Sequence, residues 1–260
     1  MKITKYIAAF LVAVTLSSCT SNNDEELISG EGALILEFDN AYNTSDLLIN
    51  STTYDANATE DITISKVKYI VSNIRLEDEN GTVFTYPEND SYFIVSEEDV
   101  ASQFVNLANV PAANYTKVTF GIGVDQEKYL EGATGQGDFL TIAQEEGMMW
   151  SWQAGYKFFV YEGTYTSETT TTATAFAFHM GSHGTSLDNY KEVTLDLPNT
   201  ARVRTNLTPE VHFIANVSKV LSGTTEFLLD DAPQIHVDGV KSPQIATNIN
   251  GMFTVDHVHN

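Results

Sequence analysis

The clearest indication of the fold is the stretch YTKVTFGIGV at residues 115–124. Its apolar residues alternate with small or polar ones, at Val118, Phe120, Ile122 and Val124. A period of two places these side chains on one face of an extended chain. β-Branched and aromatic side chains also suit a half-buried pleated surface. The stretch therefore predicts a β-strand with one face in a hydrophobic core.

Segments of similar composition recur along the chain, with turn residues between them. They cover residues 33–38, 62–76, 82–86, 92–95, 150–162, 174–180, 192–197, 201–206, 210–217 and 252–259. Asp78-Glu79-Asn80-Gly81 predicts a hairpin turn, and only residues 97–104, 126–131 and 217–221 suggest short helical turns. Many short strands with few helices are typical of a sandwich. We expect an all-β fold, an antiparallel β-sandwich of Greek-key or immunoglobulin-like type, in one domain over residues 31–260.

The first residues have the pattern of a cleavable signal peptide. Lys2 and Lys5 precede an apolar run at residues 7–16, which is too short to span a bilayer. The run ends in Leu16-Ser17-Ser18-Cys19, which resembles the bacterial lipobox. We expect residues 1–18 to be removed and Cys19 to carry lipid, which anchors the protein to a membrane. The alternative is an ordinary secreted protein whose cysteine is incidental.

Residues 19–30 are polar and acidic, with Asp24, Glu25 and Glu26 at their centre. Such a segment lacks the hydrophobicity to pack and is expected to act as a flexible tether. An acidic stretch after a lipidated cysteine also resembles the signal that sends Bacteroidetes lipoproteins to the outer face of the outer membrane. We therefore expect a lipid-anchored protein of the cell envelope.

Composition excludes several classes of function. The chain has a formal charge of −22 and only 13 Lys and Arg residues, so nucleic acid is not expected as a partner. Cys19 is the single cysteine, and once it is lipidated no thiol remains for a disulfide, an iron–sulfur cluster or a nucleophile. Any chemistry must come from His, carboxylate, Trp, Met or Tyr.

The histidines are the candidate metal ligands. In the last predicted strand, His257 and His259 share a face with Phe253 and Val255 if the alternation is regular, so two imidazoles stand side by side. His179 and His183 bracket the end of another strand. Imidazole binds copper, zinc, nickel and iron, and affinity alone favours copper. The two remaining histidines, His212 and His236, are isolated in the sequence and are interpreted as structural or surface residues.

Both tryptophans fall in the run GMMWSWQAGYKF at residues 147–158. Trp150 and Trp152 share one face of the strand predicted there. Three interpretations remain open: two large anchors of the core, a platform that stacks on sugar, or a redox-active cluster beside a metal.

An ordered set of motifs resembles one known family. The motifs are Lys68-Tyr69-Ile70-Val71-Ser72-Asn73-Ile74-Arg75-Leu76, Phe120-Gly121-Ile122-Gly123-Val124-Asp125, Met148 with Trp150-Ser151-Trp152-Gln153-Ala154-Gly155-Tyr156, Phe178-His179-Met180-Gly181 and Met252-Phe253-Thr254-Val255-Asp256-His257-Val258-His259. Together they resemble the MbnP-like family of copper-binding envelope proteins, which occurs beside methanobactin genes and in Bacteroidetes.

The resemblance implies a β-sandwich that binds copper and whose tryptophan is oxidised to kynurenine by a partner, a MauG-like dihaem cytochrome c peroxidase. Matching positions make Trp150 or Trp152 the oxidised residue, and make His179, His257 and His259 copper ligands. The sequence departs from the family at three positions: Met149 replaces a frequent Tyr, Gln153 replaces a common Asn, and Trp152 stands where related copper proteins have a ligand histidine.

Three functions compete on the sequence. The first is a copper-binding lipoprotein that captures or hands over the metal. The second is a surface glycan-binding lipoprotein that stacks sugars on Trp150, Trp152 and Tyr156. The third, an enzyme, is disfavoured because the chain lacks a Gly-x-Ser-x-Gly elbow, a His-Glu-x-x-His motif and a phosphate loop. We expect a metal-binding protein and not an enzyme.

Overall fold

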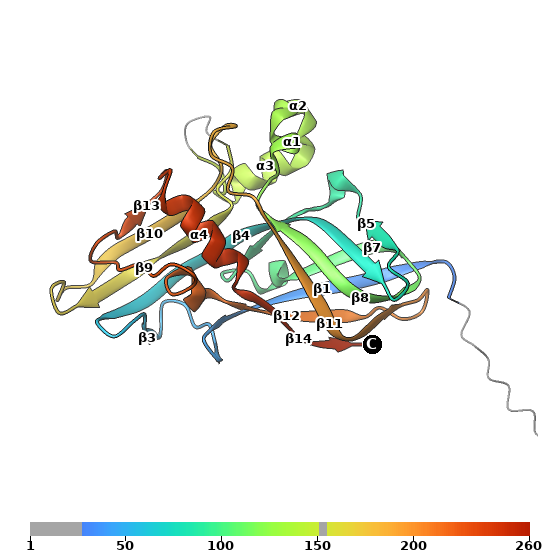
Figure 1. The fold of residues 1–260 in the computed structure, drawn as a ribbon, viewed down its shortest axis with the longest axis horizontal. Coiled ribbons are helices and arrows are strands. Elements are labelled where there is room, and N and C mark those ends of the chain that lie inside the picture. The colour runs from blue at the N-terminus through green and yellow to red at the C-terminus, as the bar shows by residue number, and fades with distance from the viewer. Residues whose placement is uncertain (1–27, 151–154) are drawn as a thin grey trace, which may run out of the picture.

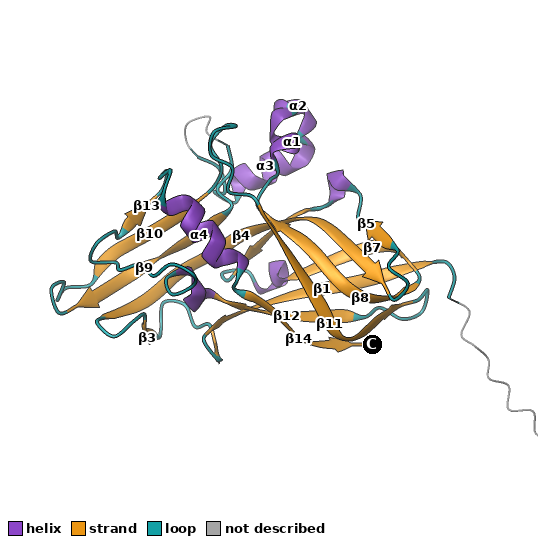
Figure 2. Ribbon diagram, viewed as in Figure 1, coloured by secondary structure: helices purple, strands orange, loops and turns teal. Residues whose placement is uncertain are grey.

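The computed structural model of the chain describes residues 28–150 and 155–260. The predictions for the signal peptide, Cys19 and Trp152 concern residues outside these ranges. Strands dominate the described part, and they run roughly along the length of the molecule (Figures 1 and 2). The all-β prediction is therefore confirmed.

The smaller of the two sheets formed by the described residues has five strands. Their order is β14-β12-β1-β2, with β7 also paired to β1. The strands are β1 (Glu31–Tyr42), β2 (Ser45–Asp46), β7 (Phe104–Pro111), β12 (Glu210–Asn216) and β14 (Phe253–His259). The first strand of the domain thus lies inside this sheet, between partners from the middle and the end of the chain.

The larger sheet has nine strands among the described residues, in the order β11-β8-β4-β9-β10-β13, with β3, β5 and β6 also paired to β4. The strands are β3 (Thr53–Asp55), β4 (Glu60–Asp78), β5 (Val83–Thr85), β6 (Tyr92–Ser96), β8 (Ala113–Ile122), β9 (Phe159–Ser167), β10 (Thr174–Met180), β11 (Lys191–Val203) and β13 (Gln234–Ile235). β4 pairs with β9 along its first half and with β8 along its second. The predicted hairpin after Asp78 joins β4 to β5.

Short helices lie between the strands in the sequence. They are α1 (Gln126–Leu130), α2 (Gly132–Gly135), α3 (Gly137–Glu145), α4 (Lys241–Asn250), and the 3-10 turns η1 (Glu88–Asp90), η2 (Val100–Gln103) and η3 (Val217–Val220). The longest of them, α4, lies across the strands in the view of Figure 1. α1, α2 and α3 gather at one end (Figure 2). The three predicted helical turns correspond to η2, α1 and η3, whereas α3 and α4 were not predicted. None of the helices in residues 28–150 and 155–260 has the length and hydropathy needed to cross a bilayer.

Aromatic side chains join the two sheets. Phe38, Phe213 and Phe253 project inward from the five-stranded sheet, and Phe120 projects from the facing one. The Phe120 ring lies edge-on to Phe38 at 5.3 Å between ring centroids and to Phe253 at 5.2 Å. Edge-to-face contacts of this kind add about 0.5–1.5 kcal/mol to the free energy gained from burial. The sandwich therefore has a continuous aromatic core between its sheets.

Two pairings differ from the predicted antiparallel arrangement. β1 pairs with β12 in parallel, and β10 pairs with β13 in parallel. The sheets are therefore mixed. Alternation within a strand identifies its buried face but does not fix the direction of its neighbour, which explains the difference.

The prediction of one strand over residues 150–162 was wrong in its first part. β9 begins at Phe159, and Trp150 precedes it in a loop. The Trp150 amide donates to the Gly155 carbonyl at 3.1 Å and the Lys157 amide donates to the Met148 carbonyl at 2.8 Å, which closes the loop on itself. Gly155 has a φ of 93°, a conformation that glycine adopts readily. An isolated antiparallel bridge between Met149 and Tyr156, and not a long strand, therefore positions Trp150.

Candidate functional site

All six histidines of the chain lie in two clusters. We call the first the Trp150 cluster; it comprises Trp150, His179, His183 and His236. We call the second the β14 cluster; it comprises His212, Asp256, His257 and His259. Each cluster brings together residues far apart in the sequence, and each belongs to a different sheet.

The strand pairing explains how His179 meets His236. Phe178 of β10 is in parallel register with Ile235 of β13, so the residues that follow them, His179 and His236, are neighbours. Their Nδ1 atoms lie 3.0 Å apart. Two imidazole nitrogens at this separation can share one metal ion, because nitrogen ligands at 2.0–2.1 Å from a metal stand roughly 3.3 Å apart in tetrahedral geometry.

Trp150 lies at the centre of its cluster. Its ring centroid is 5.9 Å from that of His179, 5.6 Å from that of His183 and 6.1 Å from that of His236. The Lys157 ammonium lies 5.6 Å from the same indole centroid, within the range of a cation–π contact. Trp150 is only 8% exposed. The indole therefore covers the imidazoles and limits the access of water.

Glu162 on β9 orients His179. Its Oε1 lies 2.6 Å from His179 Nε2, which leaves Nδ1 of the same ring to face His236. Burial lowers the pKa of His179, and the hydrogen bond to Glu162 partly offsets that effect. Burial also lowers the pKa of His183. A carboxylate behind a neutral histidine is the arrangement that commonly fixes a metal-binding imidazole.

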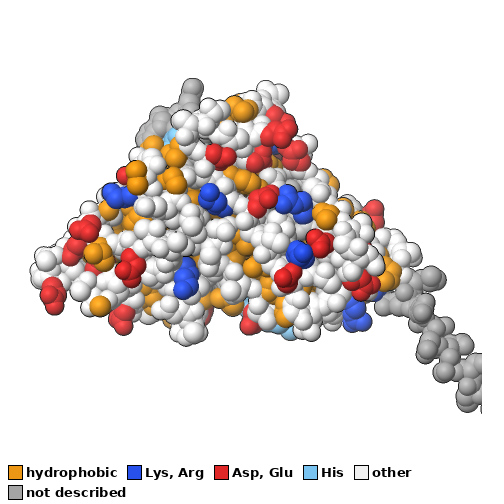
Figure 3. All heavy atoms as spheres, in the orientation of Figure 1, with side chains coloured by type: hydrophobic (Ala, Val, Ile, Leu, Met, Phe, Trp, Pro, Cys, Tyr) orange, Lys and Arg blue, Asp and Glu red, His pale blue; other side chains and the backbone are white. Residues whose placement is uncertain are grey.

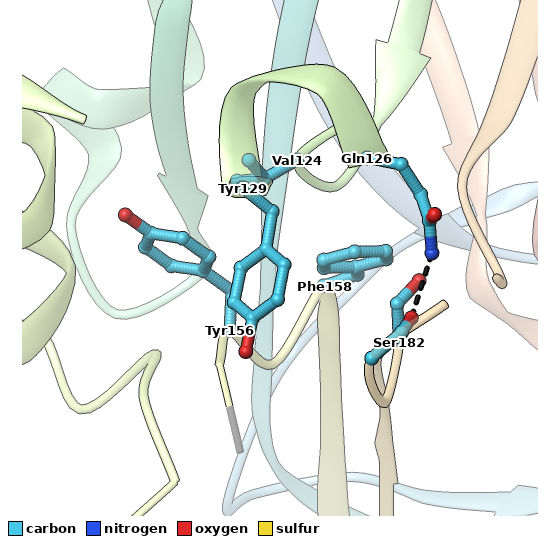
Figure 4. A pocket seen from close by; sticks show the side chains of 7 residues that line it. Val124, Gln126, Tyr129, Tyr156, Phe158 and Ser182 are labelled. Atoms are coloured by element: carbon cyan, nitrogen blue, oxygen red, sulfur yellow. Dashed lines mark hydrogen bonds between the residues drawn. The ribbon is translucent and has the colours of Figure 1, made fainter. Parts of the chain in front are cut away.

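His183 comes from the loop that follows β10. The His183 amide donates to the Leu187 carbonyl at 2.9 Å, and Gln126 Nε2 donates to the Gly184 carbonyl at 2.6 Å. Figure 4 shows Gln126 pointing to the loop that carries Ser182, at the edge of a small pocket with aromatic walls. His183 Nε2 is buried and has no hydrogen-bond partner among the described residues. These hydrogen bonds hold the loop in place, and Nε2 of His183 remains available to bind a metal ion.

A β-bulge places the β14 cluster on the outer face of its sheet. His212 pairs with His257 and Phe213 pairs with Val255, so Asp256 is an extra residue in β14. Val255 and Val258 both pack on the core, and the histidines point away from it. The predicted regular alternation, with both histidines on the face of Phe253 and Val255, was therefore wrong. His257 and His259 still share a face with each other, and their Nε2 atoms lie 2.7 Å apart.

Asp256 lies between two imidazoles of this cluster. Its Oδ2 is 2.7 Å from His257 Nδ1 and 3.4 Å from His212 Nδ1. The ligand atoms of these three residues all lie within 4.8 Å of one another. The hydrogen bond to His257 lowers the pKa of Asp256.

Two carboxylates of β1 lie beside the second nitrogen of His212. His212 Nε2 is 3.5 Å from Asp39 Oδ2 and 3.8 Å from Glu37 Oε2. Burial raises the pKa of both carboxyl groups, and His212 opposes that shift in each. The surroundings of the β14 cluster are therefore rich in negative charge.

Several predicted site residues are now placed. His179 and His183 both contact Trp150, whereas His257 and His259 lie in the other sheet, so the ligands implied by the resemblance fall into two clusters. The interpretation of His212 and His236 as isolated residues was wrong, because strand pairing brings each beside another histidine. The strand predicted at residues 210–217 contains His212, but its place beside His257 can be predicted only if the register between β12 and β14 is known. β13 has two residues and offers no periodic signal for His236.

The aromatic residues proposed as a sugar platform are buried. Trp150 is 8% exposed and Tyr156 is 1% exposed, with Tyr156 packed against Phe139. A sugar stacks only on an accessible ring face. Trp150 and Tyr156 therefore do not form such a platform in this structure.

Three comparisons relate the chain to known proteins, and one of them identifies its family. A solved structure, MbnP from Methylosinus trichosporium, matches 80% of this chain and 81% of its own at 14% sequence identity, with a TM-score of 0.48. A comparison with curated proteins gives no significant match. The sequence model of the MbnP family matches residues 31–237, which contain the whole of the Trp150 cluster. Because this match spans most of the domain, the chain belongs to the MbnP family.

Proposed function

We propose that the protein binds copper at the Trp150 cluster and serves in copper capture or handover at the cell envelope. The observation that supports this most is the pair of Nδ1 atoms, on His179 and His236, that lie 3.0 Å apart against a buried indole. Imidazole is a good copper ligand, and affinity for divalent ions in such sites peaks at copper. His183 supplies a third imidazole next to the same ring.

The residues around the pair suit a tightly held ion. Glu162 fixes the ring of His179, and the Trp150 ring restricts the approach of water. A metal replaces the proton that the two facing nitrogens must share without it. The protein itself needs no catalytic group for this role, so we propose a binding protein and not an enzyme.

Oxidation of a tryptophan to kynurenine is part of the same proposal. The catalyst is a MauG-like dihaem cytochrome c peroxidase with peroxide as the oxidant, and the candidates are Trp150 and Trp152. Oxidation opens the indole to N-formylkynurenine, and hydrolysis then releases the formyl carbon as formate. Trp150 is adjacent to three imidazoles, so a kynurenine formed there would lie beside the metal. Coexpression with the peroxidase should change the mass of the peptide spanning residues 148–157 by the loss of one carbon and the gain of one oxygen, which is the difference between tryptophan and kynurenine. An unmodified peptide from cells with active peroxidase would contradict this step and leave the histidine site untouched.

We also propose that lipid on Cys19 holds the protein at the outer membrane. The tether at residues 19–30 then separates the domain from the bilayer, which gives partner proteins access to the Trp150 cluster. Its acidic residues match the export signal described for Bacteroidetes lipoproteins.

Metal analysis of purified protein tests the copper proposal. Protein from copper-supplemented cells should carry about one copper per chain, and His179→Asn with His236→Asn should remove it. His259→Asn is the matched control, because it changes a histidine outside the Trp150 cluster. A double variant that retains as much copper as the wild type, with a far-ultraviolet circular dichroism spectrum like that of the wild type, would refute the assignment.

A further inference from the structure

The β14 cluster is separate from the residues used by the proposed function. Its members lie on β12 and β14 in the five-stranded sheet, whereas His179 and His236 lie on and beside strands of the nine-stranded one. His257 and His259 also follow residue 237, where the match to the MbnP family ends. The cluster therefore needs an explanation of its own.

The bulge in β14 gives the cluster its composition. Regular alternation allows two outward side chains over residues 256–259, but the extra residue allows three: Asp256, His257 and His259. β12 adds His212 directly opposite His257, with ring centroids 4.7 Å apart. A bulge leaves one residue unpaired and bends the strand, which is how such irregularities redirect side chains beside functional sites.

The distances fit a small metal ion. Asp256 Oδ2 lies 3.4 Å from His212 Nδ1 and 2.7 Å from His257 Nδ1, and all three ligand atoms fall within 4.8 Å. Zinc binds nitrogen and oxygen at roughly 2.0–2.2 Å, which places its tetrahedral ligands about 3.3 Å apart. Small rotations of His257 and Asp256 satisfy that spacing, since both side chains are partly exposed.

The types of ligand in the β14 cluster indicate which class of metal ion it binds. Two or three imidazoles with one carboxylate are the ligands of borderline divalent ions such as Zn²⁺. Calcium and magnesium prefer oxygen ligands alone, so the imidazoles count against them. Asp39 and Glu37 beside His212 add negative charge that favours a dication over a monovalent ion.

We propose that His212, Asp256 and His257 form a second metal site, which binds a borderline divalent cation on the outer face of the five-stranded sheet. His259 lies against the other ring nitrogen of His257, Nε2, so it borders the site and is not one of these three ligands. The side chain of His257 is 38% exposed, so an ion from solvent reaches the site without any opening of the fold. This proposal is independent of copper binding at the Trp150 cluster.

Zn²⁺ binding tests the proposal with full-length mature protein. Equilibrium dialysis against Zn²⁺, followed by metal analysis, should show a bound ion that is lost in His212→Asn with His257→Asn. His236→Asn should leave that ion in place, because it changes only the Trp150 cluster. Asp256→Asn removes a charged ligand at an exposed position and should weaken Zn²⁺ binding by at least about tenfold.

Each possible result of these measurements supports or overturns the proposed second metal site. Unchanged Zn²⁺ stoichiometry and affinity in both β14-cluster variants would overturn the proposal, as would no Zn²⁺ binding by the wild type. Loss of Zn²⁺ in His236→Asn alone would place the ion at the Trp150 cluster and would also overturn it. Because Asp256→Asn is conservative and exposed, its affinity decides the matter even if the double histidine variant fails to fold. Failure of copper binding would refute the proposed function while leaving this second site intact.

Discussion

At the scale of single residues, carboxylates fix the orientation of two imidazoles, and the partly buried carboxyl group of Glu97 is expected to make stability depend on pH. Glu162 holds one nitrogen of His179, and Asp256 holds one nitrogen of His257. In both cases the carboxylate leaves the other ring nitrogen facing a second histidine. The same arrangement, a carboxylate on one nitrogen of a histidine and a second histidine at the other nitrogen, thus occurs twice, on different strands.

Removal of Glu162 should weaken copper binding without unfolding the protein. Glu162→Ala frees the His179 ring to rotate, and loss of such an outer partner typically lowers metal affinity by about 10- to 100-fold. Competition with a copper chelator measures the change. Glu98→Ala is the control, because Glu98 also lies 4.0 Å from Lys66 but has no contact with His179 in the described structure. Equal effects of the two substitutions would contradict an orienting role for Glu162.

Glu97 should make stability depend on pH. Burial raises the pKa of Glu97 to about 7 from 4.5, although Asn40 donates to it at 3.0 Å. Between these values the folded protein holds a proton that the unfolded chain has released, so the free energy of unfolding falls as pH rises through this window. Nearby solvent limits the effect to about 1 kcal/mol.

Urea midpoints measured from about pH 4.5 to about pH 8 test this prediction. The wild type should lose stability toward pH 7 and level off above it. Glu97→Gln stays neutral at every pH and should flatten that part of the profile. A profile with the same slope in the variant would assign the pH dependence to other groups.

At the scale of elements, irregular features position the candidate sites. The β14 bulge turns two histidines outward, the closed loop before β9 presents Trp150, and the two-residue strand β13 brings His236 to His179. The bulge and β13 depend on a hydrogen-bonded register between segments distant in the sequence, whereas the loop before β9 is closed by hydrogen bonds between nearby residues. A single extra residue in a strand reverses the faces of all that follow it.

Gly181 should be intolerant of a side chain. A Cβ at this position would lie 2.3 Å from the Tyr156 carbonyl oxygen, which belongs to the backbone and cannot turn aside. Gly181→Ala should therefore cost about 1–3 kcal/mol of stability and weaken copper binding, because it separates the His183 loop from the segment that carries Trp150. Chemical denaturation measures the first effect and chelator competition the second.

Gly239→Ala is the matched control for Gly181→Ala. It lies in a nearby loop, and a Cβ there meets nothing within 4 Å. This variant should keep wild-type stability within about 0.5 kcal/mol. A Gly181→Ala protein as stable as the control would show that the contact with Tyr156 is easily relieved.

The sequence allowed prediction of the strands but not of their partners. The strand expected at residues 174–180 coincides with β10, and the segment at residues 115–124 contains most of β8. Alternation is a local property, so it identified His257 beside His259. The meetings of His179 with His236 and of His212 with His257 depend on strand pairing across long stretches of chain. Resemblance to a family supplied Trp150, whose place beside the histidines no local pattern indicates.

At the scale of the whole molecule, the strong negative charge affects how the protein interacts with ions and macromolecules around it. The chain carries a formal charge of −22, and acidic side chains are spread over the face seen in Figure 3. Such a surface concentrates cations near the protein and repels other acidic macromolecules. The electrostatic field of the protein therefore favours the binding of metal cations at both candidate sites.

Substitution of Cys19 should release the protein from the membrane. Cys19→Ser leaves no thiol for lipid, so the protein should move from the membrane fraction to the soluble envelope fraction. Its domain should keep the same thermal midpoint and copper content, because the described fold begins after the tether. Fractionation together with intact mass measures both. Membrane retention of the serine variant would contradict lipid anchoring through this residue.

The parallel pairing of β1 with β12 has a consequence for folding kinetics. β2 and β7 pair with β1 early in the chain, but Ile35 is in register with Glu210, so the first strand finds its parallel neighbour β12 only when most of the chain is present. Contacts of such high sequence separation slow folding, because loop closure must precede any gain from them. A chain exported from its N-terminus exposes the open edge of β1 until residues 210–216 arrive. Refolding from denaturant should therefore be limited by the arrival of the C-terminal strands.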